Sequence, residues 1–158
     1  MSGLPKELSS RSRDFFDGLQ ASDQWLPPGI KNLGIQPKKM LKSVSFGHTL
    51  YEWDNQGDRD VETGRAFGGW VAALSDHIVS MTMMSALSDG EWFTTMELTT
   101  RLFRPVTHGL ITIEGRLVNR GRTQGFVEAD WRNAAGKLLV RVSAMKAIRT
   151  FDEIVVKT

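Results

Sequence analysis

Residues 68–87 read GGWVAALSDHIVSMTMMSAL, a run whose apolar residues fall on nearly every side of a helix. A helix that is apolar all round has no face suited to water, so we expect it to be buried. The pair Gly68-Gly69 marks its start. The rest of the chain must therefore cover one long central helix.

Strand-like segments surround this helix in the sequence. Four of them follow it, at residues 92–104, 110–119, 122–131 and 138–148. In the second, Ile111 and Ile113 alternate with polar residues, which is typical of a strand with one face in solvent. Residues 44–53 have the composition of a strand before the helix. We expect an α+β fold, with an antiparallel sheet wrapped around the central helix, because each buries the apolar face of the other.

The segment before residue 44 is expected to lie outside this central unit. Residues 6–26 mix apolar and polar side chains at loosely helical spacing, Trp25 among them, and Pro27-Pro28-Gly29 closes the pattern. Residues 30–43 are interpreted as a connecting loop. The expected organisation is an N-terminal helix and loop in 1–43, one domain in 44–150 and a tail in 151–158.

Composition excludes several classes of protein. The chain has 158 residues, enough for one domain that buries a core without staples. It has no cysteine, so neither disulfides nor thiolate chemistry can contribute. A net charge of +2 argues against a nucleic-acid partner. Without a signal-peptide pattern or a run of roughly 20 apolar residues, we expect a cytoplasmic protein with no membrane partner.

Asp76 is the exception within the apolar run. An unpaired carboxylate is costly to bury, which favours a functional role for this residue. The alternative is an aspartate on a thin polar stripe that is paired or faces solvent. Ser80 lies one helical turn later on the same stripe, so its hydroxyl is placed to assist a reaction beside Asp76.

The start of the helix has chemistry of its own. Gly68-Gly69 leaves unpaired backbone N–H groups, bare of side chains, at the positive end of the helix dipole, a site suited to a developing oxyanion. Gly68 and Asp76 differ by eight positions, which is about 12 Å along one helix. One reacting carbonyl cannot contact both. If they cooperate, two copies of the helix must run antiparallel across a two-fold axis, so the protein must be at least a homodimer.

Residues 64–76, GRAFGGWVAALSD, resemble the helix signature of hotdog-fold acyl-CoA thioesterases of the phenylacetyl-CoA thioesterase (PaaI-type) branch. Later segments are similar to the family's next strands and turns: residues 94–98, 102–105, 117–122 and 136–138. The resemblance covers roughly residues 44–148. It implies a hotdog fold and the hydrolysis of an acyl-CoA or related thioester to free acid and thiol.

The resemblance also implies a set of catalytic residues. Asp76 falls on the family's catalytic carboxylate, which acts as general base on water or as direct nucleophile. Gly68 falls on the backbone N–H that polarises the thioester carbonyl, with Gly69 beside it. Ser80 and Thr95 fall on positions where a hydroxyl assists the acid or the water. The family uses neither a metal nor a redox cofactor, and coenzyme A is part of the substrate.

Other positions would bind the substrate. The residues implied to hold the phosphates of coenzyme A at the subunit surface are Asn119, Arg120, Gly121 and Arg122. The arginines among them are alternatively solvated charges at a strand end. Trp70 lines the acyl pocket or packs in the core, and the second interpretation is favoured. We expect a homodimer at minimum and a dimer of dimers as the assembly.

Two substitutions depart from the family pattern. Phe67 stands where a histidine precedes the glycines, and Val61 stands where an asparagine is usual. Both positions normally bind or polarise the thioester, and Glu62 or His77 are candidates to compensate. The departures leave open a non-catalytic hotdog module that binds acyl-CoA or a similar ligand. A hotdog dehydratase would need a catalytic histidine set with the acid, which is not seen.

The sequence lacks the patterns of a zinc site and of a serine hydrolase. His48, His77 and His108 lack metal-ligand spacing with one another or with acids, so we expect no zinc site. The Gly-x-Ser-x-Gly elbow of serine hydrolases does not occur.

Overall fold

The computed structural model describes residues 6–22 and 26–154, so Trp25 lies outside the described residues. Its main sheet has six antiparallel strands: β1 (Leu41–Ser45), β2 (His48–Asn55), β5 (Glu91–Leu102), β6 (Gly109–Arg120), β7 (Gln124–Asn133) and β8 (Leu138–Thr150). The strand order is β1-β2-β6-β7-β8-β5, which leaves β1 and β5 at the edges. The expected α+β arrangement and the four strands after the helix are confirmed.

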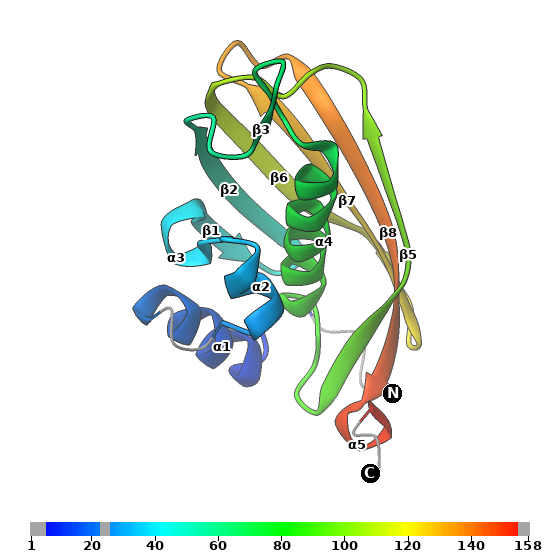
Figure 1. The fold of residues 1–158 in the computed structure, drawn as a ribbon. Helices are drawn as coiled ribbons and strands as arrows, with labels where there is room; N and C mark the ends of the chain where they lie inside the picture. The colour runs from blue at the N-terminus through cyan, green and yellow to red at the C-terminus, as the bar shows by residue number, and fades with distance from the viewer. Residues whose placement is uncertain (1–5, 23–25, 155–158) are drawn as a thin grey trace.

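The central helix α4 (Gly68–Met84) lies in the concave side of the curved sheet (Figure 1). Val71, Leu74 and Ile78 of this helix are fully buried, as are Trp131 and Val142 on the strands behind it. This packing removes the apolar surface of both layers from water, which is the main favourable term in folding. The prediction of a buried central helix is confirmed.

The strand expected at residues 44–53 is wrong in its bounds, because β1 and β2 form a hairpin there. The turn contains Gly47, whose φ of 68° lies in the left-handed region. A Cβ added to Gly47 would lie 2.9 Å from the Cβ of Leu117. Both the backbone conformation and the close approach of β6 therefore require glycine at this turn.

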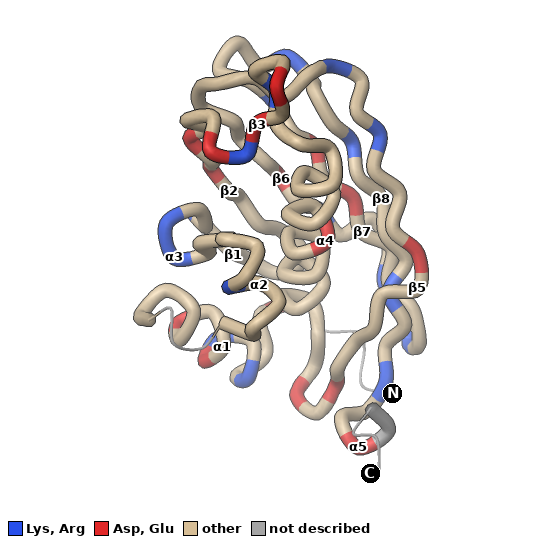
Figure 2. Tube along the Cα trace, in the orientation of Figure 1, with Lys and Arg blue, Asp and Glu red and all other residues tan. Residues whose placement is uncertain are grey.

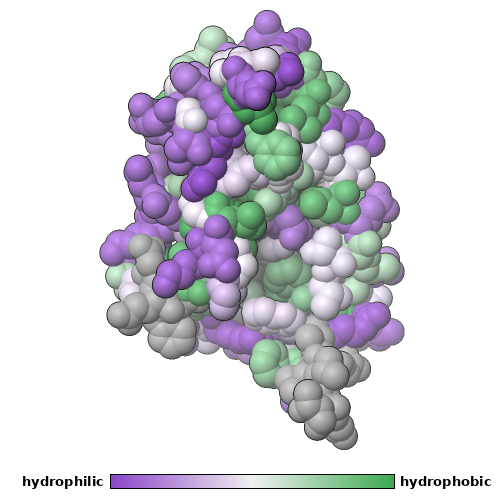
Figure 3. Space-filling model, viewed as in Figure 1, coloured by the Kyte–Doolittle hydropathy of each residue, from purple (hydrophilic) through white to green (hydrophobic). Residues whose placement is uncertain are grey.

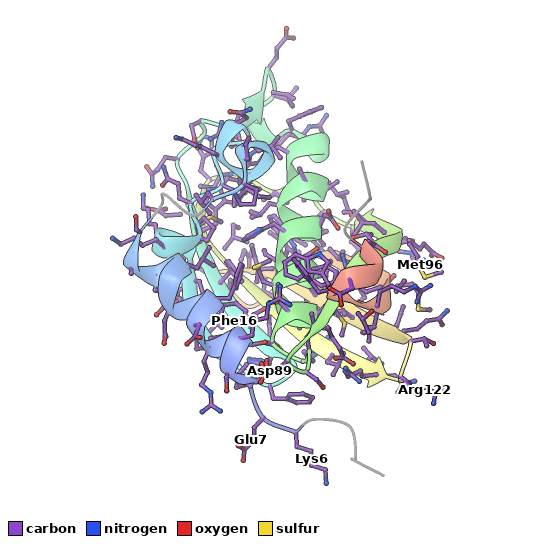
Figure 4. All side chains as sticks on the ribbon, turned by 90° about the horizontal axis from the view of Figure 1, so that it is seen from below. Lys6, Glu7, Phe16, Asp89, Met96 and Arg122 are labelled. Atoms are coloured by element: carbon purple, nitrogen blue, oxygen red, sulfur yellow. The ribbon has the colours of Figure 1, made fainter. Side chains whose placement is uncertain are left out.

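The N-terminal segment contains more helix than expected. Its helices are α1 (Ser10–Ala21), α2 (Pro28–Asn32) and α3 (Pro37–Met40). Pro28 and Pro37 each open a helix, because proline suits the first helical position, where its missing N–H is not needed. The loop expected at residues 30–43 is therefore wrong. Phe16 and Leu19 of α1 are buried in the core, and Figure 4 labels Phe16 on the side of α1 that faces the rest of the molecule.

Three short elements complete the chain. The two-stranded ladder of β3 (Asp60–Val61) and β4 (Arg65–Ala66) lies between β2 and α4 in the chain. Residues 151–154, expected as part of a tail, form the short helix α5 (Phe151–Ile154). Among the described residues, no helix is long and apolar enough to cross a membrane.

Candidate active site

Asp76 lies midway along α4 and is the one charged residue of that helix (Figure 2). Its side chain is 45% exposed, so it is neither buried nor fully solvated. Oδ1 accepts hydrogen bonds from Oγ1 of Thr95 at 3.3 Å and from Nζ of Lys146 at 3.2 Å. Within the described part of the chain, no group donates to Oδ2. One carboxylate oxygen is therefore held in place, and the other is available to a ligand or water.

Lys146 of β8 joins the predicted catalytic residues into one network. Its side chain has no exposed surface, and Nζ also donates to Oγ of Ser80 at 2.9 Å and to Oγ1 of Thr95 at 2.7 Å. The three protons of the ammonium group thus have three acceptors. Burial lowers the pKa of Lys146, and the neighbouring Asp76 carboxylate partly opposes that shift. Asp76, Ser80 and Thr95 converge on one buried cation.

Sequence reasoning missed Lys146, although the sequence contains a signal for it. Residues 138, 140, 142 and 144 form the apolar face of β8, and the next position on that face is Lys146. A lysine on the buried face of a strand is costly unless it has partners. Lys146 is thus a charged residue on an apolar face of a strand, just as Asp76 is a charged residue in an apolar helix.

A cavity of about 360 Å³ adjoins this network. Asp76 and Ser80 line it from α4, and Trp92 and Phe93 line it from β5. The remaining walls come from α1, α2 and residues 26–27. Figure 3 shows a recess with a hydrophobic floor between the N-terminal helices and β5. The Asp76 carboxylate therefore faces a mostly apolar space.

His77 lines the same cavity but turns its ring toward the sheet. Its Nε2 lies 3.4 Å from the hydroxyl of Tyr51, and the two rings are T-shaped at 5.9 Å between centroids. Burial lowers the pKa of His77 to about 4, so the imidazole is neutral at neutral pH. At neutral pH, His77 therefore carries no positive charge that could replace the histidine that the family has at the position of Phe67. Glu62 is exposed in the turn between β3 and β4.

The N-terminus of α4 is open, as expected from the two glycines. Phe67 is the N-cap residue and makes no side-chain capping bond, so the N–H groups of Gly68 and Gly69 have no acceptor among the described residues. The ring of Phe67 covers Gly69, because a Cβ added to Gly69 would lie 2.6 Å from it. Gly68 lines a different hollow of about 320 Å³, together with Val61 and Leu102. Within one chain, the helix start and Asp76 do not share a cavity.

Trp70 packs in the core, as the favoured interpretation held. It is 7% exposed, its Nε1 donates to the backbone oxygen of Leu33 at 2.9 Å, and its ring lies 4.5 Å from that of Trp53. It lines a cavity of about 420 Å³ with Lys39 and Arg59 rather than the one beside Asp76.

The four residues expected near the phosphates of coenzyme A differ in their surroundings. Arg120 is buried, donates to the backbone oxygens of Ala86 and Gly121, and forms an ion pair with Glu91. Its guanidinium is therefore committed to the fold, and this geometry does not favour Arg120 as a phosphate ligand. Asn119, Gly121 and Arg122 are exposed, and Figure 4 shows Arg122 near the end of the sheet. The described residues contain no group of three side chains able to hold a metal ion.

The family model of the thioesterase superfamily matches residues 63–140. Over this stretch the chain is similar to the thioesterase superfamily, and the resemblance stated above is confirmed. No curated protein matches the chain.

Solved structures share the fold at low sequence identity. A thioesterase from Haemophilus influenzae is 20% identical, with a TM-score of 0.67 over 77% of this chain and 82% of its own. A phenylacetic acid degradation-related protein from Ralstonia eutropha JMP134 is 23% identical. Its TM-score is 0.70, and the match covers 84% of this chain and 98% of its own. A Streptococcus mutans UA159 protein bound to acetyl CoA is 20% identical. Its TM-score is 0.65, and the match covers 70% of this chain and 88% of its own. These likenesses show that the fold is the hotdog fold.

Proposed function

We propose that the protein hydrolyses an acyl-CoA, or a related thioester, to the free acid and the thiol. One observation carries the proposal: Asp76, Ser80 and Thr95 converge on Lys146 at the edge of an apolar cavity. Burial lowers the pKa of Lys146, and its partners Asp76 and Ser80 line the cavity, an arrangement that occurs at reactive sites. The superfamily match supports the reaction class, and the structural neighbour bound to acetyl CoA supports the ligand class.

Asp76 would act through its unoccupied oxygen. Oδ2 takes a proton from water while the water attacks the thioester carbonyl, or it attacks the carbonyl directly and water then opens the resulting anhydride. The C–S bond breaks, and the thiolate that leaves takes up a proton. Lys146 and Thr95 act as positioning residues, because they hold Oδ1 and so fix the direction of the free oxygen.

The oxyanion site would come from a second copy of the chain. Gly68 and Asp76 open onto different hollows of one chain, so the carbonyl beside Asp76 needs the helix start of a partner. The edge strand β5 supports such pairing, because its outer side has no partner strand among the described residues. Exposed apolar side chains gather on and near this edge: Val61, Phe67, Met96, Leu102 and Phe103. Exposed apolar patches of this kind mark interaction sites.

A panel of thioesters read by free-thiol release tests the proposal. We expect acyl-CoA esters to release thiol, and we expect Asp76→Asn to reduce kcat by about 10²–10⁴-fold, because the amide cannot accept the proton. Asp17→Asn is the matched control, since Asp17 is exposed on α1 and does not line the cavity. Full activity of Asp76→Asn would contradict the mechanism.

A second function is favoured by one observation. The ring of Phe67 covers Gly69 at the position where the family has a polar histidine. A non-catalytic module that binds acyl-CoA would tolerate this cover, whereas an oxyanion site must be opened for the carbonyl to enter. Such a binder would gain melting temperature from CoA esters without releasing thiol in the same panel.

A further inference from the structure

The N-terminal helices close one side of the cavity beside Asp76. Phe15 and Leu19 of α1 line it, Leu26 lines it from the segment before α2, and Ile30 lines it from α2. All four residues precede residue 63, where the match to the thioesterase superfamily begins. This wall is therefore an addition of this chain to the part that the family model describes.

The wall is fastened to both elements that carry the site. The hydroxyl of Ser12 donates to the backbone oxygen of Met84 at 2.9 Å, which ties α1 to the end of α4. Arg11 donates from its guanidinium to the backbone oxygen of Glu91 at 3.0 Å, which ties α1 to the start of β5. The same guanidinium lies 4.9 Å from the centroid of the Trp92 ring. The helix is thus a fixed part of the cavity.

The lining limits the chemistry of an occupant. Met81 and Met84 face the N-terminal wall across the cavity, and Trp92 and Phe93 add aromatic surface. The polar lining groups, Asp76, His77 and Ser80, all come from α4. The volume of about 360 Å³ is at the low end of the range of about 300–1,000 Å³ for small-molecule pockets. A charged group far from α4 would lose its hydration without gaining a partner.

We propose that this cavity is the acyl subsite, that it takes an uncharged apolar acyl group, and that the N-terminal wall sets the length it accepts. This inference rests on the proposed function, since it assumes that the thioester carbonyl lies at Asp76. The sulfur and coenzyme A portion would then extend away from the wall, toward the helix start of the second copy.

Gly29 offers a direct test of the wall. It lines the cavity, and a Cβ added there would meet nothing within 4 Å, so Gly29→Leu adds apolar bulk at the wall without a clash at Cβ. Gly18 of α1 also has nothing within 4 Å but does not line the cavity, which makes Gly18→Leu the matched control. The probes are acetyl-CoA, octanoyl-CoA and the charged succinyl-CoA, read by thiol release.

We expect wild type to prefer octanoyl-CoA to the other two esters. Gly29→Leu should lower the octanoyl-to-acetyl ratio of kcat/KM by at least about tenfold, because it displaces methylene groups that the cavity would bury. Gly18→Leu should keep the wild-type ratio. Phe15→Ala, which widens the same wall, should shift the preference toward longer chains such as dodecanoyl-CoA.

The failures of the two proposals are distinguishable. If wild type hydrolyses octanoyl-CoA and neither Gly29→Leu nor Phe15→Ala changes the chain-length profile, the acyl subsite is wrong and the thioesterase stands. If wild type hydrolyses no ester, the proposed function fails, and calorimetric binding of octanoyl-CoA and acetyl-CoA to the same variants tests the subsite. If Gly29→Leu loses the preference for octanoyl-CoA and Gly18→Leu keeps it, the binding data support the acyl subsite. If all variants bind the two esters equally, or bind neither, the acyl subsite is wrong.

Discussion

Nζ of Lys146, on a side chain with no exposed surface, lies 3.2 Å from Oδ1 of Asp76, whose side chain is 45% exposed. The two charges thus differ in hydration: the lysine is desolvated and depends on its three acceptors, while the aspartate remains in contact with the cavity. The ion pair orients Asp76 without removing it from the ligand space.

Lys146→Met is expected to separate activity from stability. Without the ammonium, Oδ1 of Asp76 loses its fixed donor, and we expect kcat/KM to fall by about 10–100-fold. The loss should appear in kcat rather than in KM, because Lys146 orients the carboxylate but does not line the cavity. The free energy of unfolding should stay within about 1 kcal/mol of wild type, since a buried charge is replaced by an apolar chain and Asp76 can be solvated.

Lys137→Met is the control for this change, because Lys137 is exposed in the turn before β8. A Lys146→Met variant with wild-type kcat and a raised KM would indicate that Lys146 does not position Asp76 for the reaction.

His77 is expected to make stability depend on pH. Its pKa is about 4 in the folded chain because of burial, against 6.5 for the ordinary group. Between these values the unfolded chain binds a proton that the folded chain does not, so stability falls as the pH drops from about 6.5 to about 4. The loss between pH 7 and pH 5 is about 2 kcal/mol. Urea unfolding of wild type and His77→Asn at both pH values measures it, and an equal pH dependence in the two proteins would refute it.

Met96→Glu is expected to separate the two copies. Met96 is 58% exposed on the edge strand β5, and Figure 4 shows it at the outer side of the sheet. If two copies pair along β5, a charge at position 96 would be desolvated between them, so we expect a monomer by sedimentation. The monomer would lack the oxyanion donor of the second copy, and we expect kcat to fall by at least about 10²-fold.

Leu110→Glu serves as the control, because Leu110 is 43% exposed but lies on β6, away from that edge. Wild-type mass in the same experiment tells a dimer from the expected dimer of dimers. A fully active monomer would rule out a shared site.

Phe67→His restores the residue that the hotdog resemblance implies before the glycines. Phe67 is 58% exposed, so the change should cost little stability. It removes the ring that covers Gly69 and adds a donor for the carbonyl, and we expect kcat to rise by about tenfold. Leu110→His, at a residue 43% exposed on β6, is the control. Unchanged or lower activity in Phe67→His would show that the helix start does not receive the oxyanion.

Sequence reasoning succeeded where the pattern is local and strong. The central helix was expected at residues 68–87 and is observed as α4, Gly68–Met84. The strand expected at 138–148 is observed as β8, Leu138–Thr150. The sequence-based prediction was wrong at the hairpin of β1 and β2 and at the start of α2. Gly47 and Pro28 were interpreted as part of a strand and as the end of a helix, yet their roles depend on the elements that follow them.

Sequence alone determined that an apolar helix opened by glycines carries one acid, because helical periodicity and burial are encoded in neighbouring residues. Tertiary structure decided what surrounds that acid. Lys146 reaches Asp76 across 70 positions, while α1 and α2 wall the cavity and Glu91 binds the buried Arg120. Such partners come together only when the sheet closes around the helix. Their chemistry therefore depends on distances in space that no local pattern records.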